Sequence, residues 1–279
     1  MKKKILIIGK RSFIGSNLFN FIEKKKLKVK AISIEMFAKL SIKSLSSLDI
    51  IINCSINKNY VKKKYKLKND YDLLVAKKIK NFQSKLVIIS TRKVYKPKFN
   101  INETDKVRPK CNYSKNKLKS EMLVSKILNN RLLILRVANI IGSPKKNKRK
   151  IHKTFSDIFF DQTKKGFIYN NKNNYKDFIS IKKFCEMVFN LLKYNANGIY
   201  NISIGKKIYL NELVDWLNFY NRRKTTKIEI KKSFNNDNFT LNNKKLMNKI
   251  KTSNSLNEFK KECIKLSKYY FKKWKKKLH

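Results

Sequence analysis

The sequence predicts an α/β protein built on a doubly wound parallel sheet, with a smaller α+β unit after it. Three observations support this prediction. Short, continuously apolar runs alternate with amphipathic segments up to about residue 142, a pattern typical of strands buried on both faces between helices. A glycine turn follows the first run at once. Two later runs end in small polar residues, as expected where ligands bind at the carboxyl ends of parallel strands.

The first unit is expected to span residues 1–142. Its predicted strands cover 5–8, 29–34, 49–55, 85–91 and 132–137, and its predicted helices cover 16–24, 71–82 and 113–128. The segment 36–48 has a mixed pattern, 57–69 is a polar loop that leads into a helix, and 96–111 is irregular. Strand, helix and strand at this spacing form βαβ units, which build a parallel sheet.

The pattern changes after Gly142. A basic loop over 143–153 precedes predicted helices over 155–162, 183–194 and 210–220, and predicted strands over 167–169, 177–181, 198–203 and 227–231. The tail over 255–278 is a basic amphipathic helix, which we expect to dock its apolar stripe on the smaller unit. The second unit is therefore 143–279, with segments such as 176–203 returning to pack on the first.

The net charge is extreme: 69 Lys and Arg against 18 Asp and Glu give +51. Such a charge is common in nucleic-acid-binding proteins. Here the excess is mainly lysine, spread along the whole chain, and it accompanies many Asn, Ile and Tyr but few Gly and Pro. We interpret it as composition bias and expect no specific nucleic-acid partner. The alternative, a nucleic-acid binder, predicts strongly salt-dependent binding.

Cysteine and histidine usage excludes several kinds of site. The four cysteines lie far apart without a Cys-x-x-Cys pair, and there are only two histidines. This argues against a disulfide framework, a metal site and a histidine-based triad. No apolar run approaches the ~18 residues of a membrane span, and the run after the basic start is too short for a signal peptide. We expect a cytoplasmic protein.

Two segments have the residues for chemistry. Gly9 and Gly15 lie between a strand and a helix, where the backbone can approach a pyrophosphate and the helix N-terminus offers free N–H groups. Thr91 ends another strand, and Tyr113 precedes Lys117 by one helical turn. A phenol titrates near pH ~10, and a nearby ammonium lowers that pKa. With a hydroxyl to hold a substrate oxygen, the set suits proton transfer coupled to hydride transfer.

Taken in chain order, these segments resemble the extended short-chain dehydrogenases/reductases, the family of nucleotide-sugar epimerases, dehydratases and reductases. The matching segments are Gly9-Lys-Arg-Ser12-Phe-Ile-Gly15, Asn53-Cys-Ser55, Ser90-Thr91-Arg-Lys-Val94, Tyr113-x-x-x-Lys117, Leu135-Arg-Val-Ala-Asn139 and Lys176-Asp-Phe-Ile-Ser-Ile181. Ser12 replaces the middle glycine of the family's loop, and Lys176 replaces an arginine. The resemblance implies a Rossmann-type first unit and a second unit that clamps a sugar nucleotide.

The resemblance also implies roles for individual residues. Tyr113 would be the acid/base, Lys117 would lower its pKa and hold the nicotinamide ribose, and Thr91 would orient the substrate oxygen. The implied cofactor-binding residues are Gly9, Lys10, Arg11, Ser12, Phe13, Ile14, Gly15, Ser33, Cys54, Ser55, Tyr113 and Lys117. The implied substrate-binding residues are Thr91, Arg92, Asn139 and Lys176.

The implied activity is NAD(P)-dependent chemistry at C4 of a nucleotide-linked (deoxy)sugar. The dehydratase branch carries Asp-Glu directly after the Thr, whereas this chain has Arg92 and Lys93, which argues against a 4,6-dehydratase. Reduction of a 4-keto group in surface-glycan precursor synthesis is favoured slightly. A 4-epimerase with retained NAD stays close behind, and a non-catalytic NADP-binding regulatory module is the alternative from another class.

The cofactor is expected to be NADP(H), with NAD(H) left open. Ser33 stands where NAD-preferring relatives carry an acidic residue that binds the ribose 2′-OH, with Glu35 two residues further on. Lys10 and Arg11 lie in the glycine loop, where a guanidinium can pair with a 2′-phosphate. The oligomeric state is also left open, with a homodimer among the alternatives.

Overall fold

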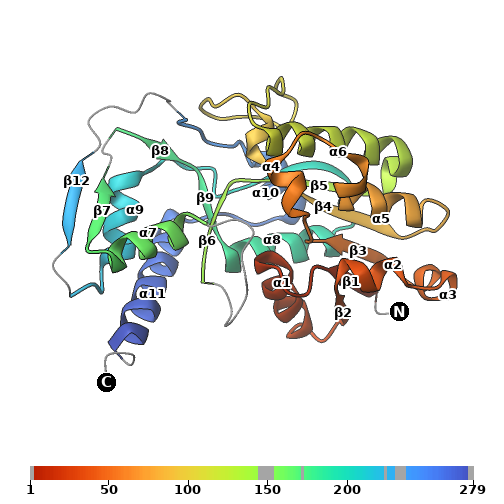
Figure 1. Ribbon diagram of the computed structural model, residues 1–279, viewed down its shortest axis with the longest axis horizontal. Coiled ribbons are helices and arrows are strands. Elements are labelled where there is room, and N and C mark those ends of the chain that lie inside the picture. Colours follow the sequence, from red (N-terminus) through yellow and green to blue (C-terminus); the bar gives the residue numbers. More distant parts are fainter. Residues whose placement is uncertain (1–2, 144–153, 171–172, 223–224, 230–236, 276–279) are drawn as a thin grey trace.

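A six-stranded sheet forms the centre of the computed structural model, which describes residues 3–143, 154–170, 173–222, 225–229 and 237–275 (Figure 1). The strand order is β10-β5-β4-β3-β1-β2, and every neighbouring pair is parallel. The strands are β1 (Lys4–Ile8), β2 (Lys28–Ile32), β3 (Ile50–Asn53), β4 (Lys85–Thr91), β5 (Leu132–Val137) and β10 (Gly198–Ile202). The predicted doubly wound parallel sheet is confirmed.

Alternation along each strand explains why the apolar runs are continuous. In β1, Ile5 and Ile7 belong to a core that includes side chains of α1 (Phe13–Glu23) and α8 (Ile181–Lys193). Leu6 and Ile8 belong to a second core on the opposite face. That face is covered by α2 (Ile34–Ala38), α3 (Ile42–Ser46), α5 (Tyr71–Ile79) and α6 (Asn112–Leu128). Both faces of the sheet are therefore buried.

The smaller unit lies beside the sheet, at the left of Figure 1. Its helices are α7 (Phe155–Lys164), α9 (Leu210–Asn218) and α11 (Leu256–Lys275). Its paired strands are β7 (Phe167–Asn170) with β12 (Thr226–Glu229), and β8 (Tyr175–Lys176) with β11 (Ile208–Tyr209). β6 (Asn139–Ile141) and β9 (Phe178–Ser180) pair where the units meet. The expected C-terminal helix is α11, and its buried Phe259 and Cys263 dock it on the core.

The structure differs from the predicted elements at several places. β10 belongs to the segment 176–203, which is expected to return to the first unit, but it does more than pack on that unit: it extends the main sheet beside β5. The predicted second strand stops at Ile32, because Ser33 is instead the N-cap of α2. Two short helices, α4 (Lys58–Lys62) and α10 (Lys244–Ile250), were not placed by the sequence. Apart from Ser143, the predicted basic loop over 143–153 lies outside the described residues, as do the ends of the segments predicted over 227–231 and 255–278.

A buried ion pair joins α6 to the sheet. Arg136 of β5 donates to both carboxylate oxygens of Glu121, with an Nη2–Oε2 distance of 2.6 Å, and the two side chains are 5% and 4% exposed. The hydroxyl of Ser90 donates to the same carboxylate, and the guanidinium lies 4.8 Å from the centre of the Tyr95 ring.

In the part of the chain that the structure describes, no helix has the length and apolar character needed to cross a membrane.

Replacing Glu121 by Ala should lower the free energy of unfolding by about 3–5 kcal/mol, because Arg136 would stay buried without its carboxylate. Urea unfolding followed by circular dichroism measures this. The matched control is Asp105→Ala, which removes the partner of Lys98 in a pair where the lysine is 53% exposed. That loss should be about 1 kcal/mol or less. Equal losses in the two variants would contradict the assigned importance of the buried pair.

Candidate functional site

The strand order reverses at β1, and this reversal opens the site. β2 lies on one side of β1 and β3 on the other, and ligands of open parallel sheets bind at such a point. The loops after β1 and β3 run so close that a Cβ on Gly9 would lie 2.8 Å from the Cys54 carbonyl carbon and the Ser55 nitrogen. Gly9 also has a φ of +102°, which favours glycine. Contact and conformation together require glycine here.

The glycine loop leads directly into α1. Ser12 is the N-cap of α1, and its Oγ accepts a hydrogen bond from the Gly15 N–H at 2.9 Å. A Cβ on Gly15 would lie 2.5 Å from the Gly9 carbonyl oxygen. Ser12 therefore replaces the family's middle glycine with a helix cap. Phe13 and Ile14, in the first turn of α1, border a cavity, so their end of the helix can bind a phosphate through backbone N–H groups.

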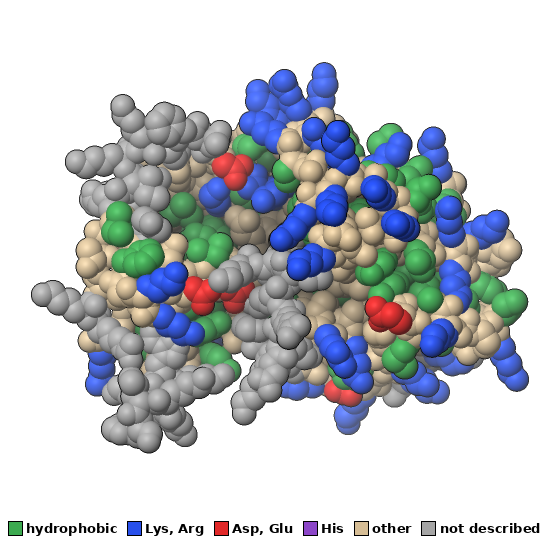
Figure 2. All heavy atoms as spheres, in the orientation of Figure 1, with side chains coloured by type: hydrophobic (Ala, Val, Ile, Leu, Met, Phe, Trp, Pro, Cys, Tyr) green, Lys and Arg blue, Asp and Glu red, His purple; other side chains and the backbone are tan. Residues whose placement is uncertain are grey.

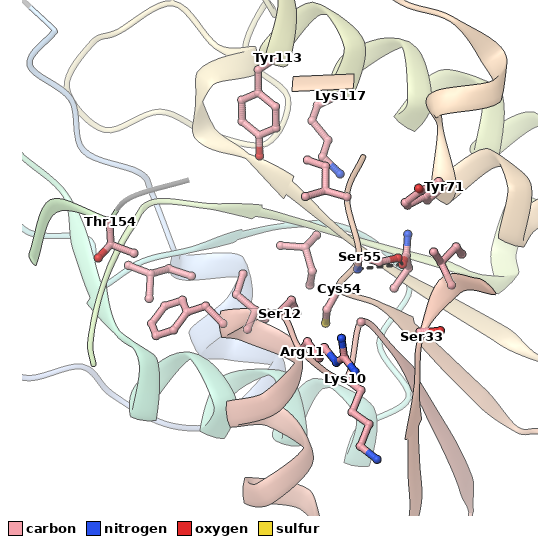
Figure 3. A pocket seen from close by; sticks show the side chains of 18 of the residues that line it. Lys10, Arg11, Ser12, Ser33, Cys54, Ser55, Tyr71, Tyr113, Lys117 and Thr154 are labelled. Atoms are coloured by element: carbon pink, nitrogen blue, oxygen red, sulfur yellow. Dashed lines mark hydrogen bonds between the residues drawn. The ribbon is translucent and has the colours of Figure 1, made fainter. Parts of the chain in front are cut away.

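This cavity has a volume of about 1180 Å³ and lies at the carboxyl ends of the strands (Figure 3). The cavity is lined by most of the residues predicted from the sequence: Gly9, Lys10, Arg11, Ser12, Phe13, Ile14, Ser33, Cys54, Ser55, Tyr113, Lys117 and Asn139. Gly15, Thr91, Arg92 and Lys176 are not among its lining residues. The lining also includes Lys93, which the sequence analysis names beside Arg92, and residues that the sequence did not single out: Met36, Ile56, Tyr71, Ile89, Ala138, Ile140, Thr154 and Phe155. Ala138 directly follows β5, and Tyr71 and Phe155 are the first residues of α5 and α7, so the prediction of strands and helices could have marked these three positions.

The residues present fit a nicotinamide dinucleotide. The volume suits a large ligand, neither Gly9 nor Gly15 has room for a Cβ, and the first turn of α1 borders the cavity. In the described part of the chain, no group of three or more His, Cys, Asp or Glu side chains is arranged to hold a metal ion.

Tyr113 and Lys117 project from α6 into the cavity, opposite the glycine loop (Figure 3). Burial raises the pKa of Tyr113, while the Lys117 charge and a side-chain hydrogen bond with Thr91 lower it. Burial prevails, assisted by the negative charge of Asp72, so the net pKa lies above its ordinary value. The expected lowering by Lys117 is therefore present but does not dominate. Thr91, although not lining the cavity, is brought to Tyr113 from the end of β4.

The sequence did not predict the partner of Lys117. Its Nζ donates to Asp72 Oδ2 at 2.8 Å, and the side chains are 6% and 4% exposed. Burial alone would lower the pKa of Lys117, but the charge and hydrogen bond of Asp72, together with Tyr113 and Asp70, raise it. Asp72 lies in the first turn of α5, where an acidic residue is ordinarily explained by the helix dipole. No local pattern therefore connects it with Lys117.

Arg92 and Lys176, predicted to bind substrate, converge on another unpredicted carboxylate. Arg92 donates to both oxygens of Asp237, at 2.8 and 2.5 Å, and Lys176 Nζ donates to Oδ2 at 2.9 Å. The Arg92 guanidinium stacks 3.9 Å from the centre of the Phe239 ring. These two cations and their hydrogen bonds hold the pKa of Asp237 well below its usual range, against the effect of burial. In this structure, both cations therefore bind an internal anion.

The other end of the cavity has charges of both signs. Ser33 accepts from the Met36 N–H as the N-cap of α2. A hydrogen bond with Ser33, and in smaller measure the charge of Arg11, lower the pKa of Glu35. Lys10, Arg11 and Glu35 all line this end.

Comparisons with known proteins identify the family and the fold. Residues 2–163 match the family model described as RmlD substrate binding domain, and no curated protein sequence matches significantly. Among solved structures, a UDP-N-acetylglucosamine 4-epimerase from Methanobrevibacter ruminantium is similar, with a TM-score of 0.77 and 18% identity over 98% of this chain and 100% of that one. A dTDP-glucose 4,6-dehydratase from Bacillus anthracis in complex with NAD has a TM-score of 0.76 and 15% identity over 97% of each chain. A UDP-glucuronic acid 4-epimerase from Bacillus cereus in complex with NAD has a TM-score of 0.75 and 15% identity over 96% of each chain. These likenesses show the Rossmann-type fold.

Replacing Gly9 by Ala should weaken NADH or NADPH binding at least about tenfold, because the added Cβ pushes the loop away from the β3 end. Titration of nicotinamide fluorescence measures this. The matched control is Gly198→Ala, where φ is +82° and a Cβ meets nothing within 4 Å. Both variants carry the strain of positive φ, about 1–2 kcal/mol, but only Gly9→Ala should lose affinity. Unchanged binding in Gly9→Ala would contradict this location of the cofactor.

Proposed function

The chain belongs to the RmlD substrate binding domain family, within the extended short-chain dehydrogenases/reductases, and on that premise we propose that it reduces the 4-keto group of a nucleotide-linked (deoxy)sugar. The observation that carries the proposal is the placement of Tyr113 and Lys117 on one wall of a cavity whose other wall is the glycine loop, with the Thr91 side chain hydrogen-bonded to Tyr113. The three side chains come from β4 and from two adjacent turns of α6.

The residues of this chain supply the proton and the orientation. The bound nicotinamide supplies the hydride. Thr91 and Tyr113 hold the carbonyl oxygen of the sugar. The carbonyl carbon accepts the hydride, and the π electrons of the C=O bond move to the oxygen. The oxygen then takes the phenolic proton of Tyr113. The product is a secondary alcohol, and the resulting phenolate faces Lys117. An ammonium carries three donors, so its contact with Asp72 does not prevent Lys117 from binding ribose hydroxyls.

Two features favour reduction over the other reactions of the family. Arg92 and Lys93 replace the acid–base pair of the dehydratases, and Arg92 is bound to Asp237, so this wall offers no carboxylic acid next to Thr91. The raised pKa of Tyr113 keeps the phenol protonated, as proton donation to a ketone requires. The second candidate is a 4-epimerase, favoured by similarity to two solved 4-epimerases.

A screen of nucleotide sugars separates these two activities. Reduction consumes one reduced nicotinamide per sugar, whereas 4-epimerisation inverts C4 without net consumption. A 4-keto sugar nucleotide that is reduced stoichiometrically supports the proposal. C4 inversion without consumption of cofactor would replace it with the second candidate.

Tyr113→Phe should lower kcat about 10²- to 10⁴-fold, because the phenolic proton is lost while the ring remains. Affinity for the cofactor should be nearly unchanged, as measured by nicotinamide fluorescence. Tyr71→Phe is the control, since Tyr71 lines the same cavity and its hydroxyl accepts a hydrogen bond from Asn57. Full activity in Tyr113→Phe would rule out this proton donor.

We also propose a preference for NADP(H) over NAD(H). Its support is the presence of Lys10 and Arg11 at one end of the cavity, where Ser33 and Glu35 also lie. Two cations against one carboxylate leave a positive balance for a 2′-phosphate. Arg11→Ala should reduce the ratio of NADPH to NADH affinity about tenfold, the value of one charge-assisted hydrogen bond. Glu35→Gln should raise the ratio, because a repelling charge is removed. Equal affinities of the unmodified protein for both cofactors would reject this preference.

A further inference from the structure

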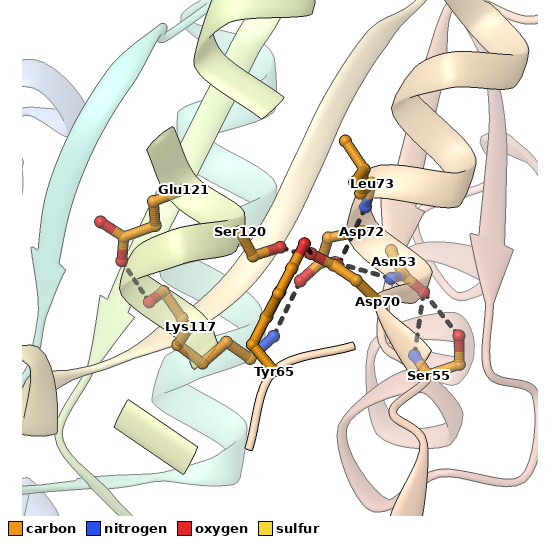
Figure 4. A network of polar contacts seen from close by, with 10 residues as sticks. Asn53, Ser55, Tyr65, Asp70, Asp72, Leu73, Lys117, Ser120 and Glu121 are labelled. Carbon is orange, nitrogen blue, oxygen red and sulfur yellow. Dashed lines mark hydrogen bonds and ion pairs between the residues drawn. The ribbon is translucent and has the colours of Figure 1, made fainter. Parts of the chain in front are cut away.

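A buried carboxylate, Asp72, contacts Lys117, and the reaction scheme gives it no role. Both oxygens of Asp72 are engaged: Oδ2 accepts from Lys117 Nζ at 2.8 Å, and Oδ1 accepts from Asn53 Nδ2 at 2.6 Å (Figure 4). The side chain is only 4% exposed. A carboxylate with both oxygens bound has little freedom to move, so it fixes the end of the Lys117 side chain.

The fixation extends to the wall of the cavity at the end of β3. Asn53 Oδ1 accepts from the Ser55 backbone N–H at 3.1 Å and from its hydroxyl at 2.6 Å. Asn53 and Ser55 line the cavity. The chain of contacts from Ser55 through Asn53 and Asp72 to Lys117 therefore spans from the β3 end to α6 (Figure 4).

The charged and polar groups that act on the proton donor come from two helices and one strand. The groups acting on Tyr113 are Lys117 of α6, Asp72 of α5, the Cys111 thiol at the N-cap of α6 and the Thr91 hydroxyl of β4. The negative charge of Asp70, the N-cap of α5, also raises the pKa of Lys117. The Nζ of Lys117 lies 5.6 Å from the centre of the Tyr60 ring of α4. Lys93 also lines the cavity and acts on Cys111. Lys117 thus has a carboxylate in direct contact and a second one nearby.

We propose that Asp72 is a positioning residue: it holds Lys117 in place and balances its charge, so that Tyr113 enters the reaction protonated and acts as a proton donor. This inference rests on the proposed function for its catalytic meaning. An unpaired ammonium beside the phenol would favour the phenolate, which suits removal of a proton from an alcohol. Pairing with Asp72 offsets that effect and suits delivery of a proton to a ketone. The raised pKa of Tyr113 agrees with this arrangement.

The test is a pH titration of the phenol itself, without cofactor or sugar. The ultraviolet absorbance of tyrosinate is recorded between about pH 6 and pH 12, a range that extends above an ordinary phenol's pKa so that midpoints can be compared. Subtracting the same titration of Tyr113→Phe isolates Tyr113. The difference should stay near zero up to about pH 9. A tyrosinate signal near neutral pH would overturn the proposal, and this arm needs no variant of Asp72.

The second arm compares Asp72→Asn with Asp72→Asn/Tyr113→Phe. Removing a negative charge from a coupled group lowers the pH at which the group loses its protons, so the tyrosinate signal should appear at least about one pH unit lower than in the unmodified protein. A purely structural role for Asp72 would change the melting temperature and leave the midpoint in place. An unchanged midpoint in folded Asp72→Asn would therefore overturn the proposal.

Asp70→Asn is the matched control. Asp70 is a buried carboxylate two residues away, and it accepts from the Ser120 and Tyr65 hydroxyls and from the Leu73 N–H. Its variant should shift the midpoint less than Asp72→Asn, and an equal shift would overturn the special role of the Lys117 contact. If the phenol titrates as expected while no nucleotide sugar is reduced, the proposed function fails and the assignment of Asp72 stands.

Discussion

The reversal of strand order at β1 is the constraint on which the rest of the site depends. β2 and β3 lie on opposite sides of β1. The chain therefore leaves the carboxyl ends of β1 and β3 in different directions, and the cavity lies above these two strand ends. The two ends approach so closely that only glycine fits at position 9. The same cavity is bordered by the first turn of α1 and, on the opposite wall, by Tyr113 and Lys117 (Figure 3).

Acidic residues are scarce in this chain, and the fold places several where a cation is buried. Only 18 Asp and Glu accompany 69 Lys and Arg. Three of these carboxylates nevertheless bind buried cations: Asp72 binds Lys117, Glu121 binds Arg136, and Asp237 binds Arg92. Each of the three cations is about 5% exposed. A buried cation without a carboxylate is costly, whereas a lysine on the surface keeps its water. Figure 2 shows Lys and Arg spread over much of the drawn face without one dominant patch, in keeping with composition bias as the origin of the charge.

The pairing of buried cations also changes what the acid–base residues can do. The spacing of Tyr113 and Lys117 predicts an ammonium that favours the phenolate, but this holds for an ammonium without a counterion. In the structure, burial and Asp72 outweigh that effect. In the same way Arg92 and Lys176, two cations expected at the substrate, bind Asp237. A substrate anion at these cations would have to compete with that carboxylate.

The sequence by itself determined the strands, the glycine turn and the tyrosine–lysine pair, because periodicity and short spacings are local: β4 and β5 begin and end where the pattern predicts. The tertiary structure alone decided which distant segments meet. Lys117 and Asp72 are 45 residues apart and Arg92 and Asp237 are 145 apart, and β10 joins the main sheet from the second half of the chain. The partner of a buried charge depends on which segments the fold brings together, and no local pattern records that.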